Sequence, residues 1–327
     1  MSLPIRLTDL GSQEAHQLDF TREALWERMD PGMGRKAVSL PVFLVNPGQM
    51  DLLYPQERLR FLDPEAVRNW VRRQRERRRE REEVGEEDAL RGLEAVEGEG
   101  YRRYKEVVAV GLYLGDPPAD ALWSRLLSQG DAPSLPKPDG PAIFLCPERI
   151  LDWAYRVGVD PQLVLDKVYY HELAHALMDT GPTPYKELWG RIVEESLANW
   201  VAFDRFRGRE ARWVQRLIQD QPPEYQGYAH LGEALRVLPQ VEAVLKEVLW
   251  RLRYFRPFWK EWLDWWEWAA ERGLPPVGLG DFLPRDFKEG DRASGWVYRA
   301  WTGAKRGRMD QEFWAVYAHH LLLEAFA

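Results

Sequence analysis

Apolar residues gather into three short runs in the first half of the chain, and these runs predict β-strands. They are AVSLPVFLV at 37–45, EVVAVGLYL at 106–114 and AIFLC at 142–146. Each is short, rich in β-branched and aromatic residues and bounded by polar segments, as is typical of strands. After residue 147 strand signals nearly vanish. The pattern therefore predicts an α+β arrangement in which strands and helices come first and helices follow.

Two consecutive helices are predicted after the third strand from their start and stop signals. Asp160 followed by proline supplies an N-cap and a first turn, and Gly181 followed by proline ends the pattern, so a helix is expected at 161–179. Thr183 followed by proline repeats the start signal for the second helix. The connection between the two helices is short, which predicts that they are neighbours.

A charged segment between the first two strands predicts a solvated helix. Asp63 followed by proline gives a start signal, and arginine and glutamate are then interleaved around RRQRERRR at 72–79. Interleaving of this kind favours pairing of side chains four residues apart over binding of phosphate. The net charge of −7 also argues against bulk binding to nucleic acid, so no nucleic-acid partner is expected.

Composition places the chain among globular proteins of a reducing compartment. Hydrophobic residues make up 45% of the 327 residues, enough for a sizeable core. The one cysteine, Cys146, excludes an internal disulfide framework, and the N-terminus lacks a signal-peptide pattern. The tryptophan-rich segment at 259–272 is interpreted as a core helix, because its charged stripe is mostly acidic. A cytoplasmic location without a membrane partner is expected, whereas the oligomeric state is not indicated.

The candidate chemistry lies in the helix predicted at 161–179, which contains the sequence HELAH. His171 and His175 are four residues apart and therefore share a face of the helix, where both imidazoles can bind one metal ion. Glu172 lies at the edge of that face. A zinc-bound water has a pKa of about 7, and a carboxylate beside it can take its proton as the water attacks a carbonyl.

A third ligand is needed, because catalytic zinc usually takes three protein ligands. Glu195, on the second predicted helix, shares a face with apolar residues, where an unpaired carboxylate would be costly to bury unless it binds a metal. Glu194 is the competing candidate, but its face carries polar neighbours, so it is expected to be the more exposed of the two. The predicted metal ligands are therefore His171, His175 and Glu195, with Zn²⁺ as the cofactor.

Together these motifs resemble the gluzincins, the thermolysin-like zinc metallopeptidases in which HExxH on one helix is completed by a glutamate on the next. HELAHALMD and ESLAN are similar to the two motifs of that group, and nineteen residues lie between His175 and Glu195. Asn199 stands where many members have aspartate. The resemblance covers about residues 140–205. It implies a zinc-dependent peptidase with Glu172 as general base and a peptide or protein as substrate.

The resemblance also implies a fold and a domain organisation. The expected fold is zincin-like, with a small sheet and the active-site helix in an N-terminal α+β subdomain at 1–180. A mainly helical C-terminal subdomain at 181–327 is expected to carry the third ligand. In the same families a strand upstream of the active helix lies along the cleft and pairs with an extended substrate, and 142–146 is expected to be that edge strand.

Two further residues are candidates for stabilising the oxyanion of a peptidase reaction. Tyr185 lies near the place where thermolysin-like enzymes carry a tyrosine, and His230 follows Tyr228 in YQGYAHLGE.

Two alternatives to a general peptidase stay open. One is a regulatory peptidase similar to the ImmA/IrrE group, which also pairs HExxH with an E-x-x-A-N stretch. The other is a non-catalytic zincin-like protein in which the metal stabilises the fold and the tryptophan-rich region binds a partner.

Overall fold

The computed structural model describes most of the first 229 residues and short stretches near the C-terminus. The described residues are 5–29, 31–55, 61–80, 89–93, 96, 101–102, 109–130, 134–179, 188–229, 318–319, 321–323 and 325–326. They group into two compact units, each drawn from segments that are far apart in the sequence. The first unit takes Met1–Arg60, Arg103–Asp179 and Val201–Gln221, and the second takes Phe61–Arg102, Thr180–Trp200 and Pro222–Ala327.

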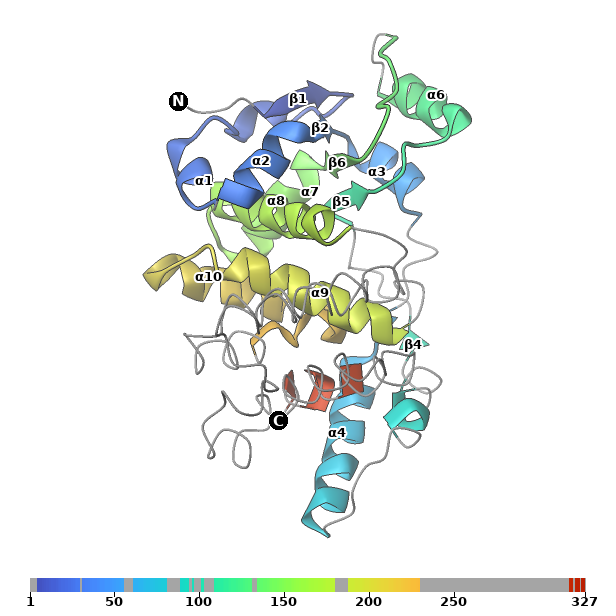
Figure 1. Cartoon of the computed structure of the whole chain (residues 1–327), viewed down its shortest axis with the longest axis vertical. Coiled ribbons are helices and arrows are strands. Elements are labelled where there is room, and N and C mark those ends of the chain that lie inside the picture. Colours follow the sequence, from blue (N-terminus) through green and yellow to red (C-terminus); the bar gives the residue numbers. More distant parts are fainter. Residues whose placement is uncertain are drawn as a thin grey trace, which may run out of the picture. The chain divides into compact units, whose positions relative to one another are not determined.

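The first unit is built on a four-stranded mixed sheet with the strand order β1-β2-β6-β5 (Figure 1). These strands are β1 (Arg6–Asp9), β2 (Pro41–Leu44), β6 (Ala142–Leu145) and β5 (Gly111–Leu114). β1, β2 and β6 run parallel, and β5 runs antiparallel to β6. β6 is buried along its whole length and β2 along most of it, which explains their continuous apolar sequences.

The sheet corrects two expectations about the predicted strands. The segment at 142–146 is not an edge strand, because β6 pairs with β2 on one side and with β5 on the other. Among the described strands, β5 is the edge strand next to β6. The run at 37–45 is only partly a strand, since helix α2 (Pro31–Ser39) takes its first residues and β2 takes the rest. The order of strands and the residue at which a strand begins depend on contacts with segments far away in the sequence, and an apolar run carries no information about those contacts.

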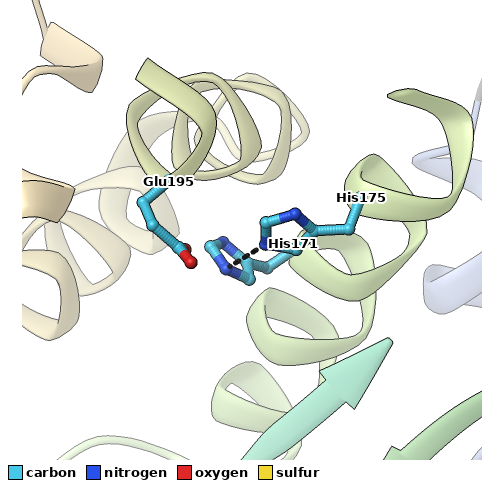
Figure 2. Close-up of side chains that lie close together, drawn as sticks. All are labelled: His171, His175 and Glu195. Carbon is cyan, nitrogen blue, oxygen red and sulfur yellow. Dashed lines mark hydrogen bonds between the residues drawn. The ribbon is translucent and has the colours of Figure 1, made fainter. Parts of the chain in front are cut away.

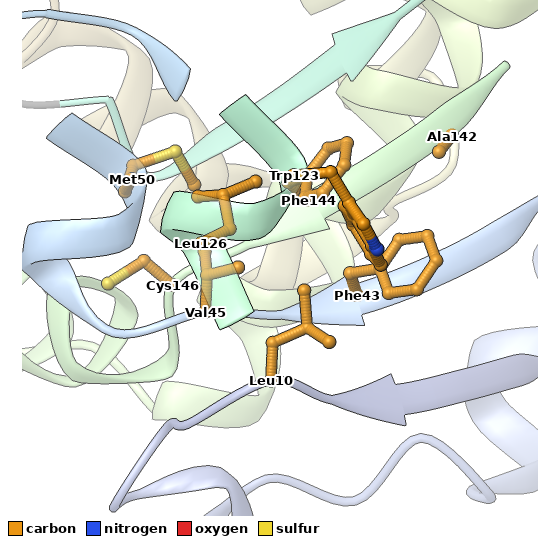
Figure 3. Close-up of a cluster of buried hydrophobic side chains, with 9 residues drawn as sticks. All are labelled: Leu10, Phe43, Val45, Met50, Trp123, Leu126, Ala142, Phe144 and Cys146. Atoms are coloured by element: carbon orange, nitrogen blue, oxygen red, sulfur yellow. The ribbon is translucent and has the colours of Figure 1, made fainter. Parts of the chain in front are cut away.

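One face of the sheet packs against helices α3 (Pro47–Leu53) and α6 (Asp120–Gln129). Figure 3 shows the buried cluster that they form with the strands, which consists of Leu10, Phe43, Val45, Met50, Trp123, Leu126, Ala142, Phe144 and Cys146. Phe43 stacks on Phe144 with 5.2 Å between the ring centroids. Because side chains alternate along a strand, Ile143 and Leu145 of β6 point to the opposite face.

The opposite face carries α8 (Pro161–Met178), the helix that contains HELAH. α8 contacts β5 and β6, and α2, α7 (Pro147–Val157) and α10 (Gly208–Gln219) pack against it. Every residue from Leu163 to Ala176 is buried, so α8 is the central helix of the unit. The predicted start is confirmed, because the carboxylate of Asp160 accepts a hydrogen bond from the main-chain N–H of Gln162 at 3.0 Å.

Asp166 connects α8 to the segment around helix α1 (Glu23–Glu27). Its side chain is 1% exposed and accepts hydrogen bonds from Arg22 and Arg28, the latter at 2.5 Å. One turn later, the Tyr170 hydroxyl donates to the main-chain oxygen of Leu25 at 2.7 Å. These contacts fix α8 at the turn immediately before the histidines.

The second unit contains α4 (Pro64–Arg79), β3 (Phe61–Leu62), β4 (Tyr101–Arg102) and the short 3-10 helix η3 (Pro223–Tyr225). It also contains most of helix α9 (Leu188–Phe203), whose last turn belongs to the first unit. The start predicted for α4 is confirmed, since Asp63 accepts a hydrogen bond from the main-chain N–H of Glu65 at 2.8 Å. β3 pairs with β4, and η3 contacts β3.

The described part of the chain therefore has an α+β fold that is mostly helical and has a small four-stranded sheet, as the sequence predicted in broad class. No helix within the described ranges combines the length and the apolar character needed to cross a membrane. The subdomain boundary at residues 180–181 stays a prediction. The tryptophan-rich segment at 259–272 lies outside the described residues.

Candidate metal centre

His171, His175 and Glu195 lie together and form a group that could hold a metal ion. One potential ligand atom from each residue lies within 4.8 Å of those of the other two. Figure 2 shows the two imidazoles and the carboxylate pointing toward one another. The residues are 6, 8 and 3% exposed, so water reaches them only to a small extent. Among the described residues, this is the one cluster of three or more potential metal-binding side chains.

The two histidines share one face of α8, as their four-residue spacing predicted. Nε2 of His175 lies 3.2 Å from Nε2 of His171, and the dashed line in Figure 2 marks this pair. Two nitrogen ligands of a tetrahedral zinc ion, each about 2.0–2.1 Å from the metal, are separated by about 3.3 Å. The observed separation therefore fits two ligands of one ion.

Glu172 lies against the edge strand β5. A β-carbon added to Gly111 would lie 2.8 Å from Oε1 of Glu172 and 2.7 Å from Cγ1 of Val168, which is too close for either atom to stay in place. Only glycine allows the strand to approach the helix this closely. Glu172 is 6% exposed, so the main chain of β5 forms one wall of a largely buried carboxylate site.

β5 follows α8 from Glu172 to the C-terminal end of the helix. Two residues after Gly111, the Tyr113 hydroxyl donates a hydrogen bond to Oδ2 of Asp179 at 2.7 Å. Gly111 and Tyr113 point to the same face of the strand because side chains alternate. The strand is thus fixed against α8 at two positions, one beside Glu172 and one at the residue that ends the helix.

Glu195 is carried by α9, which is buried along most of its length. Glu194 and Glu195 are 5% and 3% exposed, so Glu194 is the more exposed of the two, as expected, but both carboxylates are buried and exposure hardly separates them. Residues 192–202 are all buried, and such a helix has no solvent-facing side on which periodicity could place a polar residue. The group that could hold a metal ion contains Glu195, which was predicted from the apolar face it shares and from the resemblance to the gluzincins.

The 3-10 helix η3 packs against the turn of α9 that contains Glu195. Ser196 Oγ donates to the main-chain oxygen of Glu224, and Asn199 Nδ2 donates to the main-chain oxygen of Tyr225, both at 3.2 Å. Burial raises the pKa of the Glu224 carboxyl to about 7, Arg191 and the N–H of Leu62 lower it, and the nearby charge of Glu195 raises it further. Glu195 and Glu224 therefore influence each other electrostatically.

Cys146 is a buried free thiol and does not belong to the group that could hold a metal ion. It lies in the apolar cluster beneath α3 and α6 (Figure 3). Burial raises its pKa to about 12, so the thiol is protonated at neutral pH.

The other predicted site residues lie outside the described residues. They are Tyr185 and His230, the two oxyanion candidates. Thr183, the predicted start of the second helix, also lies outside the described residues. These predictions stay predictions.

Two residues near the site were missed by the sequence reasoning. Gly111 had a signal, because a glycine inside an apolar strand marks a close approach of the main chain to another group. Glu224 had none, because the segment QPPEYQ carries no motif that relates it to Glu195, 29 positions earlier.

The likeness to the gluzincins rests on the HELAH and ESLAN motifs. No known protein family matches the chain, and comparison with curated proteins and with solved structures found no match. The family assignment stays a prediction.

Proposed function

We propose that this protein is a zinc-dependent peptidase with a zincin-like active site. His171, His175 and Glu195 are the proposed metal ligands, and Glu172 is the proposed general base. The observation that carries this proposal is the convergence of two imidazoles and one carboxylate within 4.8 Å, with a further glutamate directly after the first histidine. A site that only stabilised the fold would not need this additional carboxylate.

The donor set supports zinc as the metal. Two imidazole nitrogens and one carboxylate oxygen are the ligands of many catalytic zinc sites, which keep a fourth position for water. Calcium and magnesium prefer oxygen ligands, so a site with two histidines disfavours them. The separation of 3.2 Å between the two Nε2 atoms supports the same conclusion.

Glu172 is the residue that would move protons in the reaction. Zinc at this site would lower the pKa of a bound water to about 7 and polarise the peptide carbonyl. The carboxylate of Glu172 would accept a proton from the attacking water and deliver it to the departing amine. Its position against the main chain of β5 restricts its rotamers, which supports a role that depends on orientation.

β5 supports a peptide as the substrate. It is an edge strand among the described strands and lies directly beside Glu172. An extended peptide would pair with the free edge of such a strand through main-chain hydrogen bonds, which bring a peptide bond near the base without requiring a particular sequence. β5, and not the segment 142–146, is therefore the proposed strand for pairing with an extended substrate.

The test is digestion of a peptide library by the zinc-loaded protein and by the Glu172→Gln variant. The variant should bind zinc as the wild type does and cleave about a thousandfold more slowly, because it lacks the general base. Asp152→Asn, at an exposed position of α7, is the control for loss of a carboxylate. Equal turnover by Glu172→Gln and wild type would refute the catalytic assignment. Zinc binding without cleavage by the wild type would favour the non-catalytic alternative.

A further inference from the structure

Glu224 is a buried acidic residue that has no part in the proposed reaction. It lies in η3 and is 2% exposed. Oε1 accepts a hydrogen bond from the main-chain N–H of Leu62 at 3.1 Å. Oε2 is buried and has no hydrogen-bond partner among the described residues. A carboxylate in this position costs stability, which suggests a role other than packing.

The main chain at Glu224 holds the turn of α9 that carries Glu195. Ser196, whose Oγ donates to the Glu224 carbonyl at 3.2 Å, follows Glu195 directly. Asn199, whose Nδ2 donates to the Tyr225 carbonyl at 3.2 Å, lies one turn after Glu195 on the same helical face. Two consecutive carbonyls of η3 therefore fix α9 at two positions within the turn that follows Glu195.

Gly227 shows how closely the chain after η3 approaches this turn. A β-carbon at Gly227 would lie 2.5 Å from Oγ of Ser196 and 3.0 Å from Cβ of Leu321. Ser196 is fully buried. The Ser196 hydroxyl is therefore enclosed on this side, which restricts its orientation and favours the hydrogen bond to Glu224.

The two ends of Glu224 are anchored to different elements of the second unit. Its carboxylate is attached to β3 through Leu62, and its carbonyl is attached to α9 through Ser196. A shift of η3 relative to β3 would therefore move the partner of Ser196 and disturb the turn of α9. Without the carboxylate, η3 would lose its hydrogen bond to the strand.

We propose that Glu224 is a positioning residue that holds the Glu195 turn of α9 in place for metal binding. This inference rests on the proposed function, because it takes Glu195 as a ligand. Residues that orient metal ligands typically contribute about 10- to 100-fold to metal affinity. The contribution of Glu224 comes from its hydrogen bonds, since a negative charge there would repel the carboxylate of Glu195.

The test compares the zinc affinity of the full-length wild type, Glu224→Ala and Glu224→Gln by competition with a chelating dye. Glu224→Ala should bind zinc about 10- to 100-fold more weakly. Glu224→Gln should bind within about threefold of the wild type, because the amide oxygen can still accept from the N–H of Leu62. The visible absorption of the cobalt(II)-loaded proteins should show an altered coordination geometry for the alanine variant alone.

Gln49→Ala is the matched control for the loss of buried hydrogen bonds. Gln49 is fully buried, and its Nε2 donates to the main-chain oxygens of Leu10 and Leu126 at 2.8 and 2.7 Å. It belongs to neither η3 nor α9. Both alanine variants should lower the melting temperature, but only Glu224→Ala should weaken zinc binding. A general loss of stability would instead affect the two variants alike.

Each result has a distinct meaning. If the wild type and Glu224→Ala bind zinc equally well, the positioning role is wrong and the proposed metal centre stands. If Glu224→Gln is as weak as Glu224→Ala, the hydrogen bond is not the cause and the positioning role is again wrong. A wild type that binds no zinc refutes the proposed function and this inference with it.

A second variant decides the question if Glu224→Ala does not fold. Ser196→Ala removes only the hydrogen bond to the Glu224 carbonyl and should weaken zinc binding about threefold. Unchanged affinity in Ser196→Ala would contradict the positioning role.

Discussion

The two helices that supply the proposed ligands are held in different ways. α8 is fixed by charged and polar side chains. Asp166 forms ion pairs with Arg22 and Arg28, and the hydroxyl of Tyr113 donates a hydrogen bond to Asp179 at the end of the helix. α9 is held beside Glu195 by the main-chain carbonyls of η3. α8 provides two histidines and the proposed base, whereas α9 provides one carboxylate.

This difference separates two physical requirements of the site. A base must keep its orientation, so the carboxylate of Glu172 is confined by a neighbouring strand. A carboxylate ligand needs the helix that carries it to keep its position. Hydrogen bonds from neutral side chains of the helix to main-chain carbonyls provide this without a further charged donor next to the ligand. Changes to α8 should therefore affect folding and turnover, and changes beside α9 should affect metal affinity and its dependence on pH.

The largest effect on stability is expected when the anchor of α8 is removed. Asp166→Ala should lower the free energy of unfolding by about 3 kcal/mol, because it removes the buried carboxylate that binds both Arg22 and Arg28 and leaves Arg28 only its contact with Glu210. Urea denaturation measures this change. Asp160→Ala, which removes only the N-cap of the same helix, should cost about 1 kcal/mol. Equal losses in the two variants would show that the arginines do not anchor α8.

The next largest effect is expected on turnover, through the position of the proposed base Glu172 and not through the metal ligands. Gly111→Ala should reduce turnover about a hundredfold and leave zinc affinity unchanged, because its methyl group would displace the carboxylate of Glu172. Steady-state cleavage of a peptide substrate and dye competition for zinc measure the two quantities separately.

Gly140→Ala is the matched control, since a β-carbon at that position meets no atom within 4 Å. Wild-type turnover in Gly111→Ala would show that β5 does not confine the base. A parallel loss of zinc would show that Gly111 acts on the whole helix and not on Glu172 alone.

The sequence predicts α8 well because its signals are local. The N-cap Asp160, the proline after it and the HELAH spacing all lie within one helix. The capping hydrogen bond and the shared helix face of the histidines depend only on residues two to four positions apart. His171 and His175 were predicted from their spacing, and Glu195 from the apolar helix face that it shares and from the resemblance to the gluzincins. The short connection from which the two helices were predicted to be neighbours, residues 180–187, lies outside the described residues.

The sequence fails where the decisive partner is remote. The order of strands places β6 inside the sheet and β5 beside Glu172, and apolar runs contain no information about that order. Periodicity distinguished Glu194 from Glu195 by assuming one solvent-facing side of the helix, but residues 192–202 of α9 are all buried and both glutamates lie inside. The hydrogen bonds from Ser196 and Asn199 to η3 join residues that are 28 and 26 positions apart, and neither segment carries a motif that identifies the other.

The smallest expected effect concerns the carboxyl of Glu224 beside α9 and depends on pH. Burial raises the pKa of Glu224 to about 7 from 4.5, so the native state binds its proton more tightly than the unfolded state does. The contribution of the Glu224 carboxyl to the free energy of unfolding is fully present below about pH 4.5 and is lost as pH rises through about 7.

The neutral variant Glu224→Gln should therefore gain about 2 kcal/mol in unfolding free energy relative to the wild type between about pH 5 and pH 8. Urea denaturation at both pH values measures this gain, with Glu80→Gln, at an exposed position of the same unit, as the control. A difference between Glu224→Gln and wild type that stays constant with pH would show that Glu224 is solvated or paired in a way that cancels its burial.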